Sequence, residues 1–289
     1  MKTRVVLIGL MILLGGMGAT GAEAVTTPVS VVATPAQVMQ GEPLRATVLG
    51  VTSTTSVRSR VLDGSPLGLF VYHGSVSAFV GVDLHKKPGT YALVATLYDG
   101  TVYRVDVVVV ERPHTEAPLG IPSKLGGNTT ASQKKLVDTL AAENASLAKI
   151  ISSKKVLWSE PFQMPLTNAV VTDVYGYTRQ TGAYSIAHKG TDFHASEGTS
   201  VMTINRGVVR VAHTYRDYGK TVVVDHGLGV LSFYMHLSKI SVAEGQLVTR
   251  GQVVGLSGHT GYAEQPHLHL SIRVGGVSVD PMKFFTLLQ

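Results

Sequence analysis

The chain has 289 residues, of which 15% are charged, and its formal net charge is +6 at pH 7. This length is enough for two ordinary domains with separate cores. The basic residues are scattered, and we find neither a phosphate-binding loop nor a stripe of alternating basic and aromatic residues. We therefore expect no nucleic-acid partner. A mildly basic protein would suit an anionic polymer such as a cell-wall glycan, or a lipid surface.

Residues 1–24 have the pattern of a secretory signal peptide. A basic start, MKTR, is followed by the apolar run VVLIGLMILLGGMGA and by the small-residue motif AEA. The alternative is a membrane anchor, but the apolar run is short and broken by glycines. We predict cleavage after Ala24, a location in the periplasm or outside the cell, and no membrane span after cleavage. The chain has no cysteine, which excludes disulfides, thiolate metal sites and lipid attachment after the apolar run.

Residues 25–112 are predicted to form a small β-sandwich. Seven short runs rich in Val and Thr are separated by Gly, Pro and Asp turns, and YDGT at 98–101 is a hairpin signal. The runs are VSVVATP, PLRATVLG, SVRSRVLD, LGLFVYHG, SVSAFVGVD, GTYALVATLYDG and TVYRVDVVVVE. We find no group of catalytic residues here and interpret the isolated His73 and His85 as ordinary surface or core histidines.

Residues 113–157 are predicted to be a linker followed by an amphipathic helix. The linker, 113–128, is rich in Pro and Gly. The segment 129–155 then changes character, because leucines and isoleucines recur near helical spacing and Thr129 or Thr130 could cap the start. The apolar positions are Leu136, Leu140, Leu147, Ile150 and Ile151. We expect this helix to pack between the two domains.

From Trp158 to the end of the chain, residues 158–289, the strand pattern returns. Valine-rich runs linked by tight Gly turns predict a second, antiparallel all-β domain, so that the whole chain is mostly β. The segment EGQLVTRGQVVG also resembles the hairpin of biotinyl and lipoyl carrier domains. Such a carrier needs a modified lysine on an exposed turn, and that hairpin contains no Met-Lys or Asp-Lys turn.

Two pairs of metal-binding residues lie about eighty positions apart. In AHKGTDFHA, side chains alternate along an extended strand, so His188 and Asp192 point the same way, with Gly190 leaving room between them for an ion. In HLH, His267 and His269 share a face by the same argument. Four such groups favour a metal site, and without thiols zinc has only His and carboxylate ligands. The segment SFYMHLSKI adds His236 on the polar side of a half-buried strand, on the same face as Tyr234.

Four segments together resemble a known family. HKGTD, YMHLSKI, EGQLVTRGQVVGLSGHTG and PHLHLSIRVGGVSVDP occur in the order and spacing of the LytM or lysostaphin-type zinc endopeptidases of peptidase family M23, which cleave peptide cross-links of peptidoglycan. The resemblance covers residues 158–283. The order of sandwich, helix and peptidase also looks like exported M23 proteins with an N-terminal immunoglobulin-like domain. One departure is YGYTRQ, which places Arg179 one position away from the Phe-Gly-x-Arg of many relatives.

The resemblance implies one Zn²⁺ per chain, with His188, Asp192 and His269 as ligands and His236 and His267 as catalytic residues. Three protein ligands leave a fourth position for water, as in catalytic zinc sites. The implied reaction is zinc-assisted hydrolysis of peptide bonds in peptidoglycan stem peptides and cross-links, with D,D cross-links expected by analogy. Which histidine acts as base and which as acid stays open, and so does trimming of monomeric stems as a carboxypeptidase.

Two other functions are possible alternatives to a peptidase, and the first domain could regulate the enzyme. An inactive M23 domain that activates a wall amidase would usually lack a zinc ligand, whereas all five site residues are present here. A purely structural β-protein would leave the paired histidines unexplained. The first domain is expected to inhibit the enzyme as a lid over the zinc cleft, to bind the wall, or to act as a spacer, and the sequence does not choose among these roles.

Overall fold

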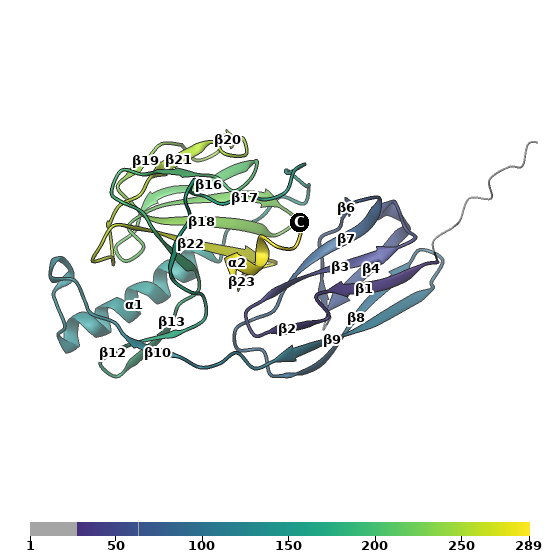
Figure 1. The fold of residues 1–289 in the computed structure, drawn as a ribbon, viewed down its shortest axis with the longest axis horizontal. Helices are drawn as coiled ribbons and strands as arrows, with labels where there is room; N and C mark the ends of the chain where they lie inside the picture. The colour runs from purple at the N-terminus through teal and green to yellow at the C-terminus, as the bar shows by residue number, and fades with distance from the viewer. Residues whose placement is uncertain (1–27, 63) are drawn as a thin grey trace, which may run out of the picture.

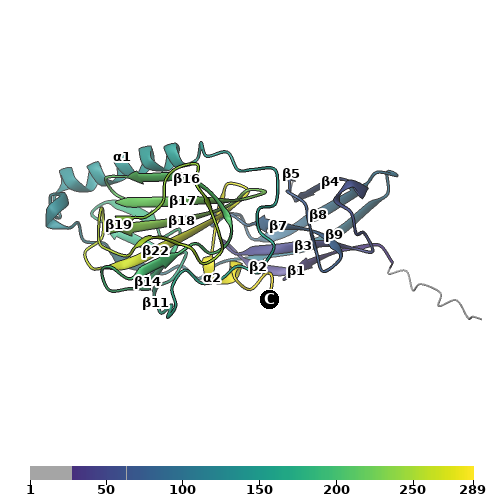
Figure 2. The same cartoon turned by 90° about the horizontal axis from the view of Figure 1, so that it is seen from above.

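The computed structural model describes residues 28–62 and 64–289, so the predicted signal peptide lies outside the described residues. A β-sandwich and a larger β-domain lie end to end, and one long helix runs along the larger domain (Figures 1 and 2). The expectation of a mostly β chain is confirmed. Among the described residues, we find no helix with the length and apolar character needed to cross a membrane.

Two sheets form the N-terminal sandwich. One sheet has the order β1 (Ser30–Thr34), β3 (Pro43–Leu49), β7 (Ser75–Gly81) and β6 (Phe70–Tyr72). The other has the order β2 (Gln37–Met39), β9 (Val102–Val110), β8 (Gly89–Leu97), β4 (Val57–Leu62) and β5 (Ser65–Pro66). Alternating side chains of both sheets meet in one core, which includes Leu44, Val76, Leu93 and Val107. The seven predicted strands are present, and β2, β5 and the 3₁₀ turn η1 (Thr54–Ser56) are additional.

The linker contains β10 (Glu116–Pro118) and the 3₁₀ turn η2 (Ser123–Leu125), and α1 (Thr130–Leu147) follows. Thr129 caps the helix by accepting a hydrogen bond from the Ser132 N–H, as the sequence suggested. Two expectations were wrong. The helix ends before Ile151, whose side chain is 85% exposed, and α1 packs on the larger domain instead of between the two domains (Figure 2).

The C-terminal domain is built around one large sheet. Its order is β11 (Val171–Asp173), β14 (Thr191–His194), β22 (His267–Val274), β18 (Val230–Leu237), β17 (Lys220–Gly227), β16 (Gly207–Thr214) and β20 (Leu247–Val248), with β23 (Val277–Val279) beside β22. A three-stranded sheet contains β15 (Ser200–Met202), β21 (Val253–Leu256) and β19 (Lys239–Ile240). Another joins β12 (Thr178–Thr181) and β13 (Tyr184–Ala187) to β10 of the linker, which pairs with β12 in parallel.

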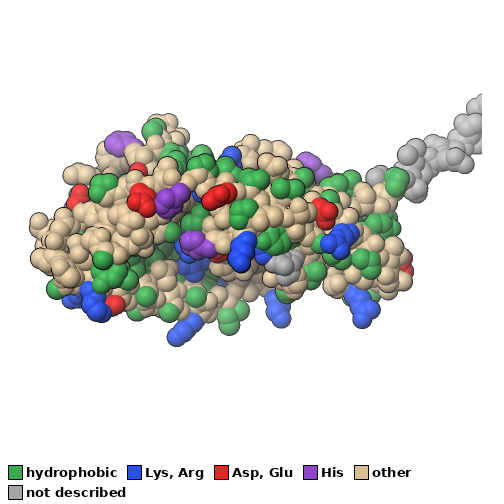
Figure 3. Space-filling model, turned by 90° about the horizontal axis from the view of Figure 1, so that it is seen from below, with side chains coloured by type: hydrophobic (Ala, Val, Ile, Leu, Met, Phe, Trp, Pro, Cys, Tyr) green, Lys and Arg blue, Asp and Glu red, His purple; other side chains and the backbone are tan. Residues whose placement is uncertain are grey.

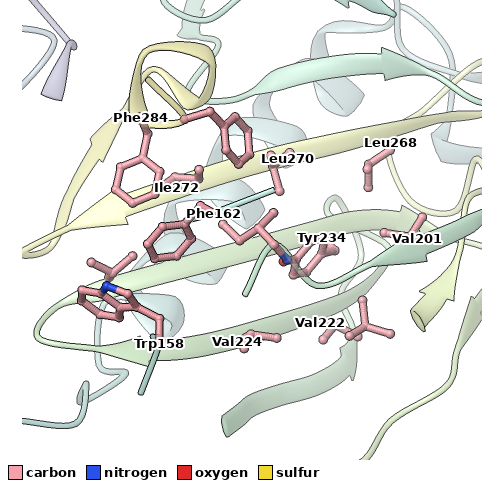
Figure 4. Packing of buried hydrophobic residues seen from close by; sticks show 14 of the residues in the cluster. Trp158, Phe162, Val201, Val222, Val224, Tyr234, Leu268, Leu270, Ile272 and Phe284 are labelled. Atoms are coloured by element: carbon pink, nitrogen blue, oxygen red, sulfur yellow. The ribbon is translucent and has the colours of Figure 1, made fainter. Parts of the chain in front are cut away.

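The large sheet has two different faces. Leu268, Leu270 and Ile272 of β22 point into the main core, where Figure 4 shows them with Trp158 and Phe162. The alternate positions His267, His269 and Ser271 therefore lie on the opposite face. Part of that face is covered by the C-terminal half of α1, through a smaller cluster of Leu147, Val211, Val223, Leu231, Phe233 and Met235.

Aromatic packing joins the two domains. Phe79 of β7 belongs to the core of the C-terminal domain, and its ring centroid lies 5.2 Å from that of Phe284 in the short helix α2 (Pro281–Phe284) and 5.8 Å from that of Trp158. Polar contacts add to this, because the Asp280 N–H donates to the Gly41 carbonyl at 2.8 Å. The two domains therefore share a core and are held in a fixed arrangement.

We expect Phe79→Ala to lower the free energy of unfolding by about 3–5 kcal/mol, because it removes a fully packed ring from the shared core. Chemical denaturation of the purified chain measures this. The control is Tyr98→Ala, which removes a 67% exposed ring from the same sandwich and should change the free energy by about 0.5 kcal/mol or less. Equal effects of the two changes would contradict a shared core.

Candidate metal centre

Three buried side chains converge on the face of the large sheet opposite the main core. His188 follows β13, Asp192 lies in β14 and His269 lies opposite Asp192 in the antiparallel pairing of β14 with β22. His188 Nε2 lies 3.2 Å from both Asp192 Oδ1 and His269 Nδ1, and His269 Nδ1 lies 2.7 Å from Asp192 Oδ1. Among the described residues, these three form a group that could hold a metal ion.

The donor set fits a tetrahedral metal. In a tetrahedral zinc site with bonds of about 2.1 Å, neighbouring ligand atoms are about 3.4 Å apart. The three donor atoms, His188 Nε2, Asp192 Oδ1 and His269 Nδ1, lie 3.2, 3.2 and 2.7 Å from one another, slightly closer than this value. Small movements of the side chains would therefore make room for an ion between them. Two imidazoles and one carboxylate are also the nitrogen and oxygen donors that catalytic zinc sites use.

The outer atom of each of these side chains is already held. His188 Nδ1 donates to the Val174 carbonyl at 2.7 Å, which leaves the lone pair of Nε2 free. Ser271 Oγ donates to the Lys189 carbonyl, so it accepts from His269 Nε2 at 2.9 Å and leaves Nδ1 free. Such outer contacts fix the tautomer and orientation of metal ligands.

Arg179 holds the outer oxygen of the carboxylate. Its Nη2 lies 2.7 Å from Asp192 Oδ2, which leaves Oδ1 facing the two imidazoles. The sequence motif shows Arg179 only as displaced by one position and does not reveal this contact. Arg179 lies in the β12–β13 hairpin, where it pairs with Ile186.

Gly190 is required by the close approach of an imidazole. A Cβ atom at this position would lie 2.3 Å from His269 Nε2 and 2.7 Å from the Leu270 carbonyl oxygen. The sequence interpretation was that this glycine makes room for an ion. The structure shows that the room is taken by the His269 ring.

His236 and His267 lie beside the three converging residues. Their ring centroids are 5.0 Å apart, and His267 Nε2 is 3.9 Å from Asp192 Oδ1. His236 reaches this position through a backbone φ of +61°, an unfavourable conformation for a residue with a side chain. Strand alternation alone was the wrong argument here, because Tyr234 points into the main core and does not share a face with His236.

Both of these histidines present an unprotonated nitrogen when neutral. His236 Nδ1 donates to the Thr260 carbonyl and His267 Nδ1 to the Gln265 carbonyl, each at 2.9 Å. A carbonyl oxygen only accepts, so the proton of each neutral ring is on Nδ1. Their Nε2 atoms are therefore able to accept a proton or, once protonated, to donate one.

Burial and charge favour the ionisation states that bind a metal. Burial lowers the pKa of His269 to about 4 although Asp192 opposes this, and neutral imidazole is the form that coordinates. Burial acts to raise the pKa of Asp192, but the attraction of His269 and the hydrogen bonds of His188 and His269 outweigh it and hold that pKa well below its usual value. Burial, with the charges of His267 and His269, keeps the pKa of His236 well below its usual value.

A cavity of about 600 Å³ opens beside these residues. It is bordered by α1, by the β12–β13 hairpin and by the loop that carries Tyr262. The linker also borders it through Leu119, and the sandwich through Asp83 and His85. On the face of the molecule seen from below, histidine and charged side chains gather around a hollow near the middle (Figure 3).

Two further histidines near the site do not converge with the others. His194 is exposed at the end of β14, and His259 lies 3.2 Å from Glu197.

Residues 186–281 match the family model of peptidase family M23. The segment includes His188, Asp192, His236, His267 and His269. The C-terminal domain therefore contains an M23 metallopeptidase domain, and the resemblance stated from the sequence is confirmed.

Curated proteins of known name share this domain. The chain is 47% identical over 96 residues to peptidoglycan DD-endopeptidase ShyA of Vibrio cholerae serotype O1, covering 33% of this chain and 22% of ShyA. It is 35% identical over 119 residues to DD-carboxypeptidase/endopeptidase Mpg of Neisseria meningitidis serogroup B, covering 41% of this chain and 27% of Mpg. The matches thus span about a quarter of the length of these relatives.

A solved structure resembles nearly the whole chain. It comes from Pseudomonas aeruginosa, is provisionally described as a peptidase M23, and is 26% identical with a TM-score of 0.56. The match covers 87% of this chain and 96% of that one, so the similarity extends beyond the metallopeptidase domain.

We expect His188→Ala and Asp192→Ala each to abolish or sharply weaken binding of a divalent metal, because each removes one of three converging donors. Metal content of the purified, folded variants, measured by mass spectrometry, checks this. His194→Ala is the matched control, since it removes an exposed histidine two positions after Asp192 and should keep the metal. Full metal content in the first two variants would refute the ligand assignment.

Proposed function

We propose that the protein is a zinc-dependent endopeptidase that hydrolyses peptide cross-links of bacterial peptidoglycan, with D,D cross-links as the bonds cut. The observation that carries this proposal is the convergence of His188, Asp192 and His269 beside His236 and His267, all within the M23 domain. The names of the relatives, peptidoglycan DD-endopeptidase and DD-carboxypeptidase/endopeptidase, support the substrate class.

Zinc bound by His188, Asp192 and His269 would supply a Lewis acid and a water of lowered pKa. His267 is suited to take a proton from an attacking water, because its Nε2 lies on the side of Asp192 and is unprotonated in the neutral ring. His236, held through Nδ1 by Thr260, presents an Nε2 that can take up a proton and, once protonated, donate to the developing oxyanion or to the leaving amine. The positive φ of His236 is consistent with this positioning.

Arg179 and Ser271 complete this arrangement without contacting the reacting atoms. Arg179 keeps the Asp192 carboxylate turned toward the two imidazoles, and Ser271 fixes the tautomer of His269. Both contacts are preformed, so little ordering is needed when a metal and a peptide bind.

A peptidoglycan substrate requires export, and we propose that residues 1–24 direct it, so that the protein acts in the periplasm or outside the cell. The basic start, apolar run and small-residue motif support this. The amidase-activating function is less well supported, since the five site residues are present and come together.

The proposed activity is tested by incubating the metal-loaded chain with soluble cross-linked muropeptides and identifying the products by mass spectrometry. Conversion of dimers to monomers supports a cross-link endopeptidase, whereas release of a terminal amino acid from monomers indicates a carboxypeptidase. We expect His236→Ala to keep its metal but to lose hydrolysis by about 100-fold or more, because it removes a proton donor. No cleavage by the wild-type chain would reject the proposal, and a fully active variant would remove His236 from it.

We further propose that the N-terminal part of the chain restrains the enzyme through the linker. The Leu119 N–H donates to the Gln180 carbonyl at 2.7 Å on one side of the cavity, and the Tyr262 hydroxyl donates to the Gly120 carbonyl at 2.5 Å on the other. Lys124 Nζ also donates to the His259 carbonyl. The linker thus bridges two borders of the cavity, whereas the sandwich contributes only Asp83 and His85.

We expect Leu119→Pro to raise the rate of muropeptide hydrolysis by about 2- to 10-fold, because it removes one hydrogen bond that holds the linker at the cavity. The control is His114→Pro, in the same linker, where we find no partner for the backbone N–H among the described residues. A truncated chain is a poorer test, because Phe79 would be lost from the shared core. Equal rates in wild type and Leu119→Pro would refute the restraint.

A further inference from the structure

The cavity beside the candidate metal centre continues along β22 to the positively charged side chain of Arg273. His269, Ser271 and Arg273 alternate on the same face of this strand, and all three border the cavity. Because an extended strand rises about 3.3 Å per residue, the backbones of His269 and Arg273 are about 13 Å apart. A peptide that reaches the metal centre through this cavity would therefore pass the Arg273 side chain.

Arg273 has no acidic partner in the part of the chain that the structure describes. Its guanidinium lies 4.5 Å from the centre of the Phe233 ring, and its nearest hydrogen-bond acceptor is Asn144 Oδ1 of α1 at 3.5 Å. Within the described ranges, no carboxylate lies within 4 Å of it. In contrast, Arg179, which borders the same cavity, is paired with Asp173 and Asp192.

The surroundings of Arg273 disfavour an isolated charge. Burial lowers the pKa of its guanidinium, and the neighbouring Tyr218 only partly offsets this. The acidic groups that border the cavity are engaged elsewhere, since Asp217 pairs with Arg216 and Asp83 Oδ1 accepts from the His85 N–H at 2.8 Å. A half-buried cation without a counter-ion is stabilised when a ligand supplies one.

The walls around Arg273 favour a peptide over a small inorganic anion. Apolar side chains of α1 and of β18 border the cavity on two sides, namely Leu136, Val137, Leu140, Phe233 and Met235. The planar guanidinium of arginine can donate two parallel hydrogen bonds to one anion. On a peptide, the anion with the matching geometry is a carboxylate.

We propose that Arg273 binds a free carboxylate of the peptide substrate and so selects acidic peptides for cleavage. This inference rests on the proposed function for its substrate class, but it concerns a different residue and a binding step. Arg273 is then a specificity-determining residue. Its guanidinium lies over the Phe233 ring, and its Nη2 is 3.5 Å from Asn144 Oδ1 of α1.

A binding experiment tests this without relying on catalysis. The probes are soluble stem peptides in three forms, with all carboxylates free, with only the C-terminal carboxylate amidated, and with all carboxylates amidated. Dissociation constants are measured by calorimetry with the full chain and with Leu119→Pro, because the linker borders the same cavity. We expect full amidation to weaken binding by about 10- to 100-fold, the effect of losing a charge-assisted hydrogen-bonded pair. The singly amidated probe shows whether the C-terminal or a side-chain carboxylate is bound.

Arg273→Met is the decisive variant, because methionine keeps an apolar stem over Phe233 and removes the charge. We expect it to bind free and amidated peptides equally, whereas Arg273→Lys should keep part of the preference. Arg104→Gln is the control, since Arg104 is 67% exposed on the sandwich and should leave the preference unchanged. Thermal denaturation confirms that each variant is folded.

Three outcomes would overturn the proposal. They are equal binding of free and amidated peptides by the wild-type chain, a preference retained in Arg273→Met, and no binding of any probe to either the full chain or Leu119→Pro. Hydrolysis of cross-linked muropeptides is followed separately. If the wild-type chain hydrolyses muropeptides but shows no preference for free carboxylates, the carboxylate site alone is rejected. If the wild-type chain shows a clear preference but no hydrolysis, the endopeptidase alone is rejected.

Discussion

The antiparallel pairing of β14 with β22 is the constraint on which the site depends. It places Asp192 directly opposite His269, and the bend at Gly190 then brings His188 to the same point. The pairing is held from behind by Phe193, Leu268 and Leu270, which are fully buried in the main core. His269 is thus brought to Asp192, 77 residues away in the sequence, by one strand pair, and His188 joins them from the segment just before β14. The proposed metal centre is therefore built on the strands that also form the core beneath it.

The cleft is assembled from more than the metallopeptidase domain. Residues of the large sheet, of α1 and of the linker line the cavity, and the sandwich contributes Asp83 and His85 from one loop. The shared aromatic core around Phe79 and Trp158 keeps these parts in register. In the proposed hydrolase, segments that carry no chemistry themselves would therefore help to shape the path of the substrate. The sandwich, which contributes Asp83 and His85 to the border of this cavity, shows no catalytic pattern in its sequence.

Much of the site could be predicted from the sequence, since period-two alternation correctly places His267 and His269 on one face, and the motif order identifies the family. Alternation failed at His236, because a positive φ turns this residue away from the face that Tyr234 occupies. The contact of Arg179 with Asp192 depends on the geometry of a hairpin, and the linker across the cavity depends on tertiary packing. The apolar pattern of the helix did not reveal that α1 packs on the larger domain, because periodicity defines an apolar face but not its partner.

We propose that His188, Asp192 and His269 bind one zinc ion, each through one specified atom. Anomalous diffraction at the zinc absorption edge, from crystals of the zinc-loaded protein, tests it most directly. We expect a single peak within about 2.2 Å of His188 Nε2, Asp192 Oδ1 and His269 Nδ1, with His236 and His267 outside bonding distance. A peak bound by His267 or His236 in place of one of these residues, or no peak at this position, would contradict the account.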